Sequence, residues 1–182
     1  MYTFQICRNG KTVNLTVMQD RYKGGSLRLA MFLKDVVNGS SFYGDLTHGT
    51  VMLDNKHAFV LEGDNDRQMV MDTLQRLGAA TPTNKIGKSK DGTKRYRIWY
   101  FHADKLERYC SKSRTLQKVE VHDSISTQLR VLKDMGKITN PPVEVALRKK
   151  LYTTCKSSIQ VEAAVHDIKI GRQTIGQFLD KQ

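Results

Sequence analysis

The chain has 182 residues, 39% of them hydrophobic, and a formal charge of +12, which is enough apolar content for one large domain or for a moderate domain and a small one. Its three cysteines, Cys7, Cys110 and Cys155, lie far apart and form no CxxC pair, which argues against a disulfide framework or a structural zinc site. Because no signal-peptide pattern opens the sequence and no apolar run approaches the roughly 20 residues that span a bilayer, we expect a soluble protein of the reducing cytoplasm without a membrane partner.

The N-terminal part of the sequence has the pattern of short strands. Asn9-Gly10 lies between the runs TFQIC and TVNLTV, and this dipeptide favours a type I′ hairpin because both central residues of that turn need a positive φ. SLRLAMFLKD fits a helix or a strand, and the alternation of apolar residues from Leu27 to Leu33 between turn-forming glycines favours the strand. The same pattern of short strands continues in SFYGDLT, TVML and HAFVLEG. We therefore expect a meandering antiparallel sheet.

A helix is predicted over DNDRQMVMDTLQRLG, residues 64–78. Asp64 or Asn65 can cap its N-terminus, apolar residues recur on one face, and Gly78 can adopt the left-handed conformation that ends it. We expect this helix to cover the sheet. The following stretch, ATPTNKIGKSKDGTKRYRIWYF, predicts two strands joined by a turn at Asp91-Gly92, so the basic segment of the chain is largely a hairpin.

Beyond about Tyr109 the pattern becomes helical. DSISTQLRVLKDMG predicts a helix capped by Asp123 or Ser124 and stopped by Gly136. A second helix begins at the Asn140-Pro-Pro sequence, because proline is tolerated in the first turn, and runs to about Cys155. A third is capped by Ser157 or Ser158.

These elements predict an α+β fold class with two parts. Residues 1–110 form an N-terminal α+β domain with an antiparallel sheet, a covering helix and the basic hairpin. Residues 118–182 form a small all-helical domain that ends in a helix-turn-helix at 158–180. The boundary is expected near residues 110 to 120.

The positive charge is unevenly distributed. From Thr83 to Lys118 there are eleven basic residues against three acidic ones, which leaves +8 of the total +12 in this segment. Such a field favours polyanions through counterion release. We expect phosphate contacts from the hairpin and from two lysines further along the chain: Lys85, Lys88, Lys90, Lys94, Arg95, Arg97, Lys149 and Lys150. The aromatic residues of RYRIWYF can stack on unpaired bases only where they face outward, and because a strand alternates its faces one set must be core.

The segment VEAAVHDIKIGRQTIGQFL, residues 161–179, reads as two short helices joined by a tight turn. Its apolar residues are spaced to pack the two helices together. The outer face of the second helix then carries side chains suited to a DNA groove, since arginine pairs with guanine, glutamine with adenine, and threonine with phosphate or a thymine methyl. The predicted contacts are Arg172, Gln173, Thr174, Gln177 and Lys181.

This segment resembles the helix-turn-helix of phage regulators and resolvase-type recombinases. The resemblance rests on Ala164, Ile168, Ile170, Gly171, Arg172 and Thr174-Ile175. It implies that the second helix reads the major groove. The sequence departs from the pattern at Val165, where the family has a small residue, and at Lys169, where it has the glycine of the turn. A lysine there would be strained by a positive φ.

The N-terminal part resembles a small domain of uncharacterised phage and plasmid proteins. The matching residues are Tyr22-Lys-Gly-Gly and the later Leu46-Thr47 pair. This resemblance implies a mobile-element origin and no particular activity.

We therefore expect a non-catalytic protein that binds double-stranded DNA, a regulator of phage or mobile-element type in the cytoplasm of a bacterial host. RNA is the other nucleic acid to consider, and a homodimer would lengthen the site. The alternative is a counter-defence inhibitor, similar to anti-CRISPR proteins, that binds a host RNA-guided nuclease or its nucleic acid.

Enzyme functions have little support in the sequence. The five histidines are scattered without an HExxH motif or a cysteine partner, there is no phosphate-binding loop or nucleophile motif, and no cofactor is expected. Asp45, His48, Asp54 and His57 are the residues that would have to converge in a metal-dependent nuclease, which is the remaining enzyme alternative.

Overall fold

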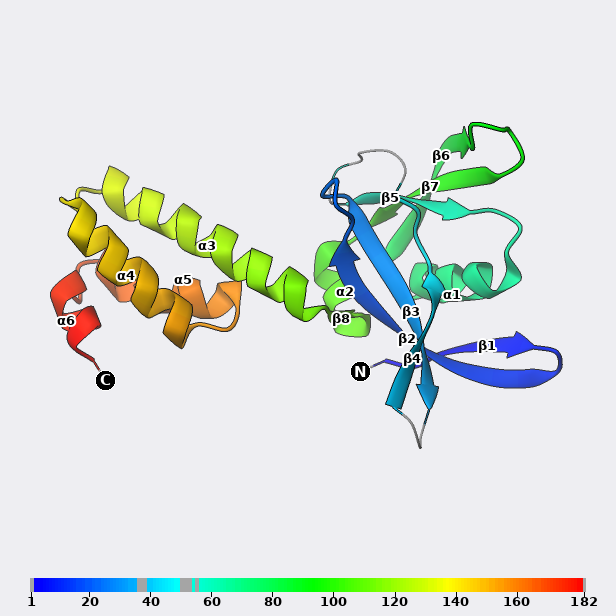
Figure 1. Ribbon diagram of the computed structural model, residues 1–182, viewed down its shortest axis with the longest axis horizontal. Helices are drawn as coiled ribbons and strands as arrows, with labels where there is room; N and C mark the ends of the chain where they lie inside the picture. The colour runs from blue at the N-terminus through cyan, green and yellow to red at the C-terminus, as the bar shows by residue number, and fades with distance from the viewer. Residues whose placement is uncertain (1, 36–38, 50–53, 55, 182) are drawn as a thin grey trace. The chain divides into compact units, whose positions relative to one another are not determined.

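The computed structural model describes residues 2–35, 39–49, 54 and 56–181. Contacts divide the chain into two compact units, Met1–Ser113 and Arg114–Gln182, coloured blue to green and green to red in Figure 1. Antiparallel sheets occupy the first unit, and helices alone make up the described part of the second. The α+β fold class predicted from the sequence is therefore confirmed. Each unit is described separately below.

The first sheet of unit 1 has the order β1-β2-β3-β4, with a fifth strand, β8, parallel to β2. Asn9 and Gly10 have φ angles of 51° and 72°, so the predicted β1–β2 hairpin with two positive φ values is confirmed. The segment from Leu27 is a strand that pairs on both sides, as its alternation predicted. The strands are β1 (Phe4–Arg8), β2 (Lys11–Arg21), β3 (Leu27–Asp35), β4 (Gly39–Asp45) and β8 (Ser111–Lys112).

The second sheet has the order β5-β7-β6 and is antiparallel throughout. Its strands are β5 (His57–Leu61), β6 (Ala80–Lys88) and β7 (Arg95–Phe101). The strands thus divide between two sheets, whereas the sequence pattern predicted one meander. Alternation identifies a strand but not its partner, and β5 pairs with the distant β7. The predicted strand at 50–53 lies outside the described residues.

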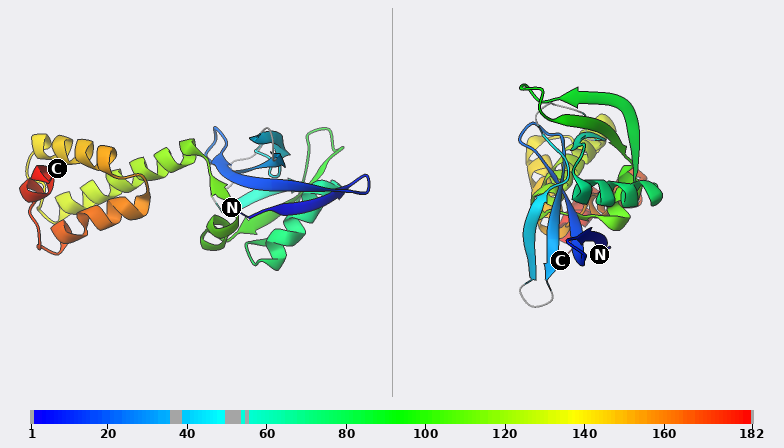
Figure 2. Two further views of the ribbon diagram at one scale, coloured as in Figure 1. Left: turned by 90° about the horizontal axis from the view of Figure 1, so that it is seen from below. Right: turned by 90° about the vertical axis from the view of Figure 1, so that its right-hand side faces the viewer.

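Two helices complete unit 1. In α1 (Asn65–Arg76), Asp64 accepts a hydrogen bond from the Arg67 backbone N–H, and Gly78 has a φ of 66°, so both predicted helix ends are confirmed. This helix contacts β1 and β6 and places Val70, Met71 and Leu74 in a core shared with both sheets. The short α2 (Ala103–Tyr109) was not predicted. Figure 2 shows the β6–β7 connection at the periphery of this unit, away from α1.

Unit 2 contains α3 (Arg114–Asp134), α4 (Pro141–Thr154), α5 (Ser158–Lys169) and α6 (Ile175–Asp180). Asn140 and Ser157 cap α4 and α5 as predicted. The predicted start of the first helix at Asp123 or Ser124 is wrong, because α3 begins nearly three turns earlier. Leu116 and Val121 continue its apolar stripe, and nothing between them breaks a helix.

The core of unit 2 is separate from that of unit 1. It is built from one face each of α3, α4 and α5, and α6 adds Ile175. The contacts run from α3 to both α4 and α5, and from α4 to α6. Over the part of the chain that the structure describes, no helix is both long and apolar enough to cross a membrane. The buried residues are Val121, Ile125, Leu129, Leu132, Ile138, Leu147, Leu151, Cys155, Val161, Val165, Ile168 and Ile175.

Candidate nucleic-acid interface

The tip of the β6–β7 hairpin, residues 89–94, is a loop closed by its own hydrogen bonds. The Ser89 backbone N–H donates to the Lys94 carbonyl at 2.9 Å, and the Lys94 N–H donates back to the Ser89 hydroxyl at 3.0 Å. Asp91 accepts from the Ser89 hydroxyl and from the Thr93 N–H, and these bonds lower the pKa of Asp91 to about 2. Gly92 takes a φ of 72°. The loop is therefore ordered locally, and its one carboxylate is engaged in the turn.

The predicted lysines of the hairpin, Lys85, Lys88, Lys90 and Lys94, all have exposed side chains. Among the described residues none of the four forms an ion pair. These four ammonium groups are thus not paired with a carboxylate, and the hairpin tip between them carries only the single negative charge of Asp91. This is the arrangement that a phosphate backbone requires.

The two predicted arginines of the hairpin are in a different position. Glu62 accepts from the guanidinium of Arg97 at 3.0 Å and lies 3.4 Å from Arg95. The carboxylate therefore offsets part of the positive charge of the two guanidinium groups. Sequence reasoning missed Glu62, because the pairing follows from the β5–β7 register.

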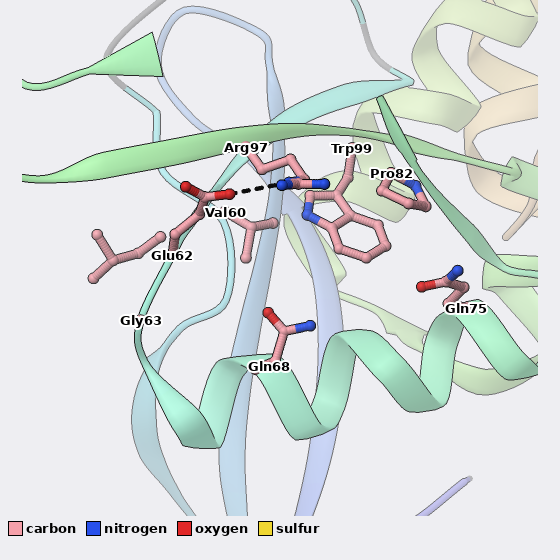
Figure 3. A pocket seen from close by; sticks show the side chains of 9 residues that line it. Val60, Glu62, Gly63, Gln68, Gln75, Pro82, Arg97 and Trp99 are labelled. Atoms are coloured by element: carbon pink, nitrogen blue, oxygen red, sulfur yellow. Dashed lines mark hydrogen bonds and ion pairs between the residues drawn. The ribbon is translucent and has the colours of Figure 1, made fainter. Parts of the chain in front are cut away.

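Below these arginines lies a cavity of about 410 Å³ between α1 and the second sheet. Figure 3 shows Arg97 between Glu62 and Trp99 on the sheet side, with Gln68 and Gln75 reaching up from α1. The Gln68 amide donates to Asp72 at 2.6 Å. The Arg97 guanidinium is thus held by Glu62 at one end of this cavity, which Trp99 also lines.

The aromatic residues of β7 are largely unavailable for stacking on bases. Trp99 is 4% exposed and Phe101 1%, and both belong to the core of unit 1. Tyr96 is stacked on His48 with ring centroids 4.8 Å apart. Tyr100 lies edge-on to both His57 and His102. The sequence suggested that outward-facing aromatic residues of this strand could stack on bases. None of the rings of Tyr96, Trp99 and Phe101 is free to do so.

In unit 2 the structure brings three of the predicted contact residues together. The Lys150 ammonium of α4 donates to the carbonyl of Lys181, and the Lys181 ammonium donates to the Gln173 side-chain oxygen at 3.3 Å. Lys149 on α4 and Arg172 in the α5–α6 turn are exposed, and neither forms an ion pair among the described residues.

The turn between α5 and α6 differs from the one expected. Lys169 is the last residue of α5, and the positive φ of 77° falls on Gly171 instead. The predicted strain at Lys169 is therefore wrong, because a glycine two residues later takes the left-handed conformation at no steric cost. Arg172 and Gln173 both donate their backbone N–H to the Asp167 carbonyl, at 2.9 and 3.1 Å, which closes the turn.

The predicted reading helix is correspondingly shorter. Arg172, Gln173 and Thr174 precede α6 and do not lie on its outer face. Thr174 is the cap of α6: its hydroxyl accepts from the Gln177 N–H at 3.2 Å, and the Gln177 side chain accepts from the Thr174 N–H at 2.9 Å. These two side chains satisfy the first turn of a six-residue helix.

The residues considered for a metal-dependent nuclease do not converge. Asp45 pairs with Arg28 at 2.9 Å, and His48 stacks on Tyr96. Asp54 lies 2.8 Å from the His57 Nδ1, and this hydrogen bond is the main cause of the lowered pKa of Asp54. Among the described residues no three histidine, cysteine or acidic side chains are placed to hold one metal ion.

No family model, curated protein or solved structure matches this chain. Its function is therefore inferred from charge and geometry.

Proposed function

We propose that this protein binds nucleic acid without catalysis, double-stranded DNA in the first place, and that the tip of the β6–β7 hairpin supplies the main contact with the phosphate backbone. The observation that carries the proposal is the group of four exposed hairpin lysines without a carboxylate partner among the described residues. Strand β6 carries Lys85 and Lys88, and the ordered loop that follows it carries Lys90 and Lys94, so several phosphates can be contacted at once.

Lysine chemistry makes this contact tolerant of sequence. An ammonium group is a point charge on a flexible stem, so it follows phosphates without distinguishing bases. Each phosphate that a lysine neutralises releases counterions and adds about 0.9 to the slope of log affinity against log salt for duplex DNA. Binding through the hairpin should therefore be strongly salt-dependent.

The C-terminal unit adds further exposed basic residues, among them Lys149 and Arg172. Because both units belong to one chain, binding by one raises the local concentration of the other near the same nucleic acid. Sequence reading, where it occurs, falls to Arg172, since the Thr174 and Gln177 side chains are engaged in capping α6.

The proposal is tested by fluorescence anisotropy with labelled duplex DNA, single-stranded DNA and duplex RNA, each titrated at low and at physiological salt. The variant Lys90→Ala/Lys94→Ala should bind duplex DNA about tenfold more weakly at low salt, and the magnitude of its salt slope should fall by about 1.8, which is twice 0.9.

The matched control is Lys11→Ala/Lys23→Ala, which removes the same charge from exposed positions elsewhere in unit 1. This control should bind duplex DNA within about twofold of the unaltered protein, since only general charge is lost. Equal losses in the two variants would show that net charge alone drives binding. No binding to any of the three nucleic acids would instead favour the counter-defence inhibitor, which acts by contacting a protein.

A further inference from the structure

Unit 2 contains a depression of about 510 Å³ between the first half of α3 and the end of α4. Its volume lies within the range of about 300 to 1,000 Å³ typical of small-molecule sites. Val121 from α3 and Cys155 at the end of α4 are buried and form its apolar floor. None of its residues belongs to the hairpin or to the α5–α6 turn.

Helical spacing places the residues of α3 that line the depression. Arg114, Lys118, Val121 and His122 stand at positions i, i+4, i+7 and i+8, which share one face of a helix. On the other side, Lys156 follows α4 directly. The Lys156 backbone N–H donates to the Gln160 side chain at 2.6 Å, so the backbone at Lys156 is held next to the start of α5.

The rim of the depression is cationic. Arg114, Lys118 and Lys156 all have exposed side chains, and no carboxylate lines the depression with them in the part of the chain that the structure describes. None of the three forms an ion pair among the described residues. The Lys156 ammonium donates only weakly, at 3.4 Å, to the Thr153 carbonyl. Three cations around one site favour a ligand with a multiply charged anionic group.

The wall of the depression holds two aromatic rings. The His122 Nδ1 and the Tyr152 hydroxyl are hydrogen-bonded, and the two ring centroids lie 5.9 Å apart with a tilt of 34°. This bond fixes both rings beside the apolar floor. Inorganic phosphate would satisfy the cations but leave the rings and the floor uncovered, whereas a flat aromatic body would cover them.

We infer that this depression binds a nucleotide with a terminal phosphate, that is, a nucleobase joined through its sugar to a phosphate group. The phosphate lies among Arg114, Lys118 and Lys156, and the base packs against His122 and Tyr152. The ligand is either a free mononucleotide or the terminal nucleotide of a strand. This site is separate from the hairpin contact proposed above and adds a second kind of nucleic-acid chemistry to the protein.

The test is isothermal titration calorimetry of the full chain with each of the four ribonucleoside monophosphates, with adenosine, and with inorganic phosphate. At least one monophosphate should bind about tenfold or more tightly than adenosine and than phosphate, since only the monophosphate reaches both the cations and the rings. Absence of binding by all four monophosphates, or equal binding of inorganic phosphate, would overturn the inference.

Arg114→Gln/Lys118→Gln should weaken the bound monophosphate at least tenfold, and Tyr152→Ala should weaken it while leaving phosphate binding unchanged. The matched control is Arg130→Gln/Lys137→Gln, which removes two exposed charges of the same unit outside the depression. Equal losses in the two double-charge variants would also overturn the inference.

Two further arms separate the ligand sources and the two proposals. Single strands with a 5′-phosphate or a 5′-hydroxyl are titrated into Lys90→Ala/Lys94→Ala, in which the hairpin contact is weakened. Their affinities, compared with that of the free monophosphate, show whether the ligand is a strand end or a free nucleotide. If the hairpin variant still binds the monophosphate, the depression is a separate site. If the hairpin variant no longer binds the monophosphate, the inference of a separate site is overturned.

Discussion

The tip of the β6–β7 hairpin and the α5–α6 segment are both rich in polar and basic residues, but their side chains are engaged very differently. In the hairpin, backbone groups, Ser89 and Asp91 hold the loop together and the lysines remain exposed. In the α5–α6 segment, Thr174 and Gln177 themselves hold the structure together. Lysine side chains are thus available for binding in the hairpin, whereas two polar side chains that were predicted to contact DNA are committed to folding in the α5–α6 segment.

The difference comes from how each region satisfies its backbone. A hairpin pairs most of its N–H and C=O groups across two strands, so only Ser89 and Asp91 at the turn are needed to complete the hydrogen bonding and the lysine side chains are not. A short helix leaves its first N–H groups without partners, and nearby hydroxyl and amide groups must supply them. Polar residues before a short helix are therefore weaker evidence for DNA reading than lysines on a hairpin.

The largest expected effect concerns packing beneath the α5–α6 segment. Ile168→Ala should lower the free energy of unfolding of unit 2 by about 2–5 kcal/mol, because Ile168 is buried at the end of α5. Chemical denaturation followed by far-UV circular dichroism measures it. Ile159→Ala, at a largely exposed position of the same helix, is the control and should change stability by less than about 0.5 kcal/mol. Comparable losses would mean that α5 packs through another face.

The turn gives the next effect. Gly171→Ala should cost about 1–2 kcal/mol, because alanine is disfavoured at a φ of 77°, although an added Cβ would meet only the Lys137 ammonium at 4.0 Å. Gly176→Ala, inside α6, should instead stabilise unit 2 by roughly 0.5–1 kcal/mol, because alanine is the better helix former. Thermal unfolding of the two variants distinguishes these signs. An unchanged stability of Gly171→Ala would mean that residue 171 does not need the left-handed conformation.

Thr174 was predicted to contact DNA but caps α6 in the structure, and two substitutions distinguish these roles. Thr174→Ala should cost about 1 kcal/mol through loss of the cap, whereas Thr174→Ser keeps the oxygen and should cost little. Affinity for duplex DNA, measured on the folded variants, should stay within about twofold in both. A large loss of affinity in Thr174→Ala at a temperature where it remains folded would return this residue to the DNA contact.

The smallest effect is at the hairpin tip and depends on pH. The pKa of Asp91 is lowered to about 2, below its ordinary value near 3.8, so the ionised carboxylate stabilises the loop above about pH 4. This contribution should diminish as the pH falls from about 4 through about 2. Protection factors of the Thr93 and Lys94 amides, which are exchange rates corrected for the intrinsic pH dependence of exchange, should fall over this interval when followed by NMR. Asp91→Asn should remove the pH dependence, and an unchanged profile in that variant would assign it to another group.

Much of the fold could be predicted from the sequence because it rests on local rules. Asn9-Gly10, Asp64, Gly78, Gly136, Asn140 and Ser157 all act at the ends of elements as their chemistry requires. The start of α3 could not be located in this way, since the Asp123-Ser124 pair resembles a cap but lies within a longer helix. A cap residue is a signal only where the apolar stripe before it stops.

The candidate sites divide in the same manner. The sequence alone determined where the positive charge lies along the chain and that it would fall on a hairpin, because composition and alternation are local properties. Only the tertiary structure decided which of those charges are free. Glu62 meets Arg95 and Arg97 through strand register, and Arg114, Lys118 and Lys156 surround one depression through helix packing. Both relations join residues far apart in the chain, and no local pattern encodes them.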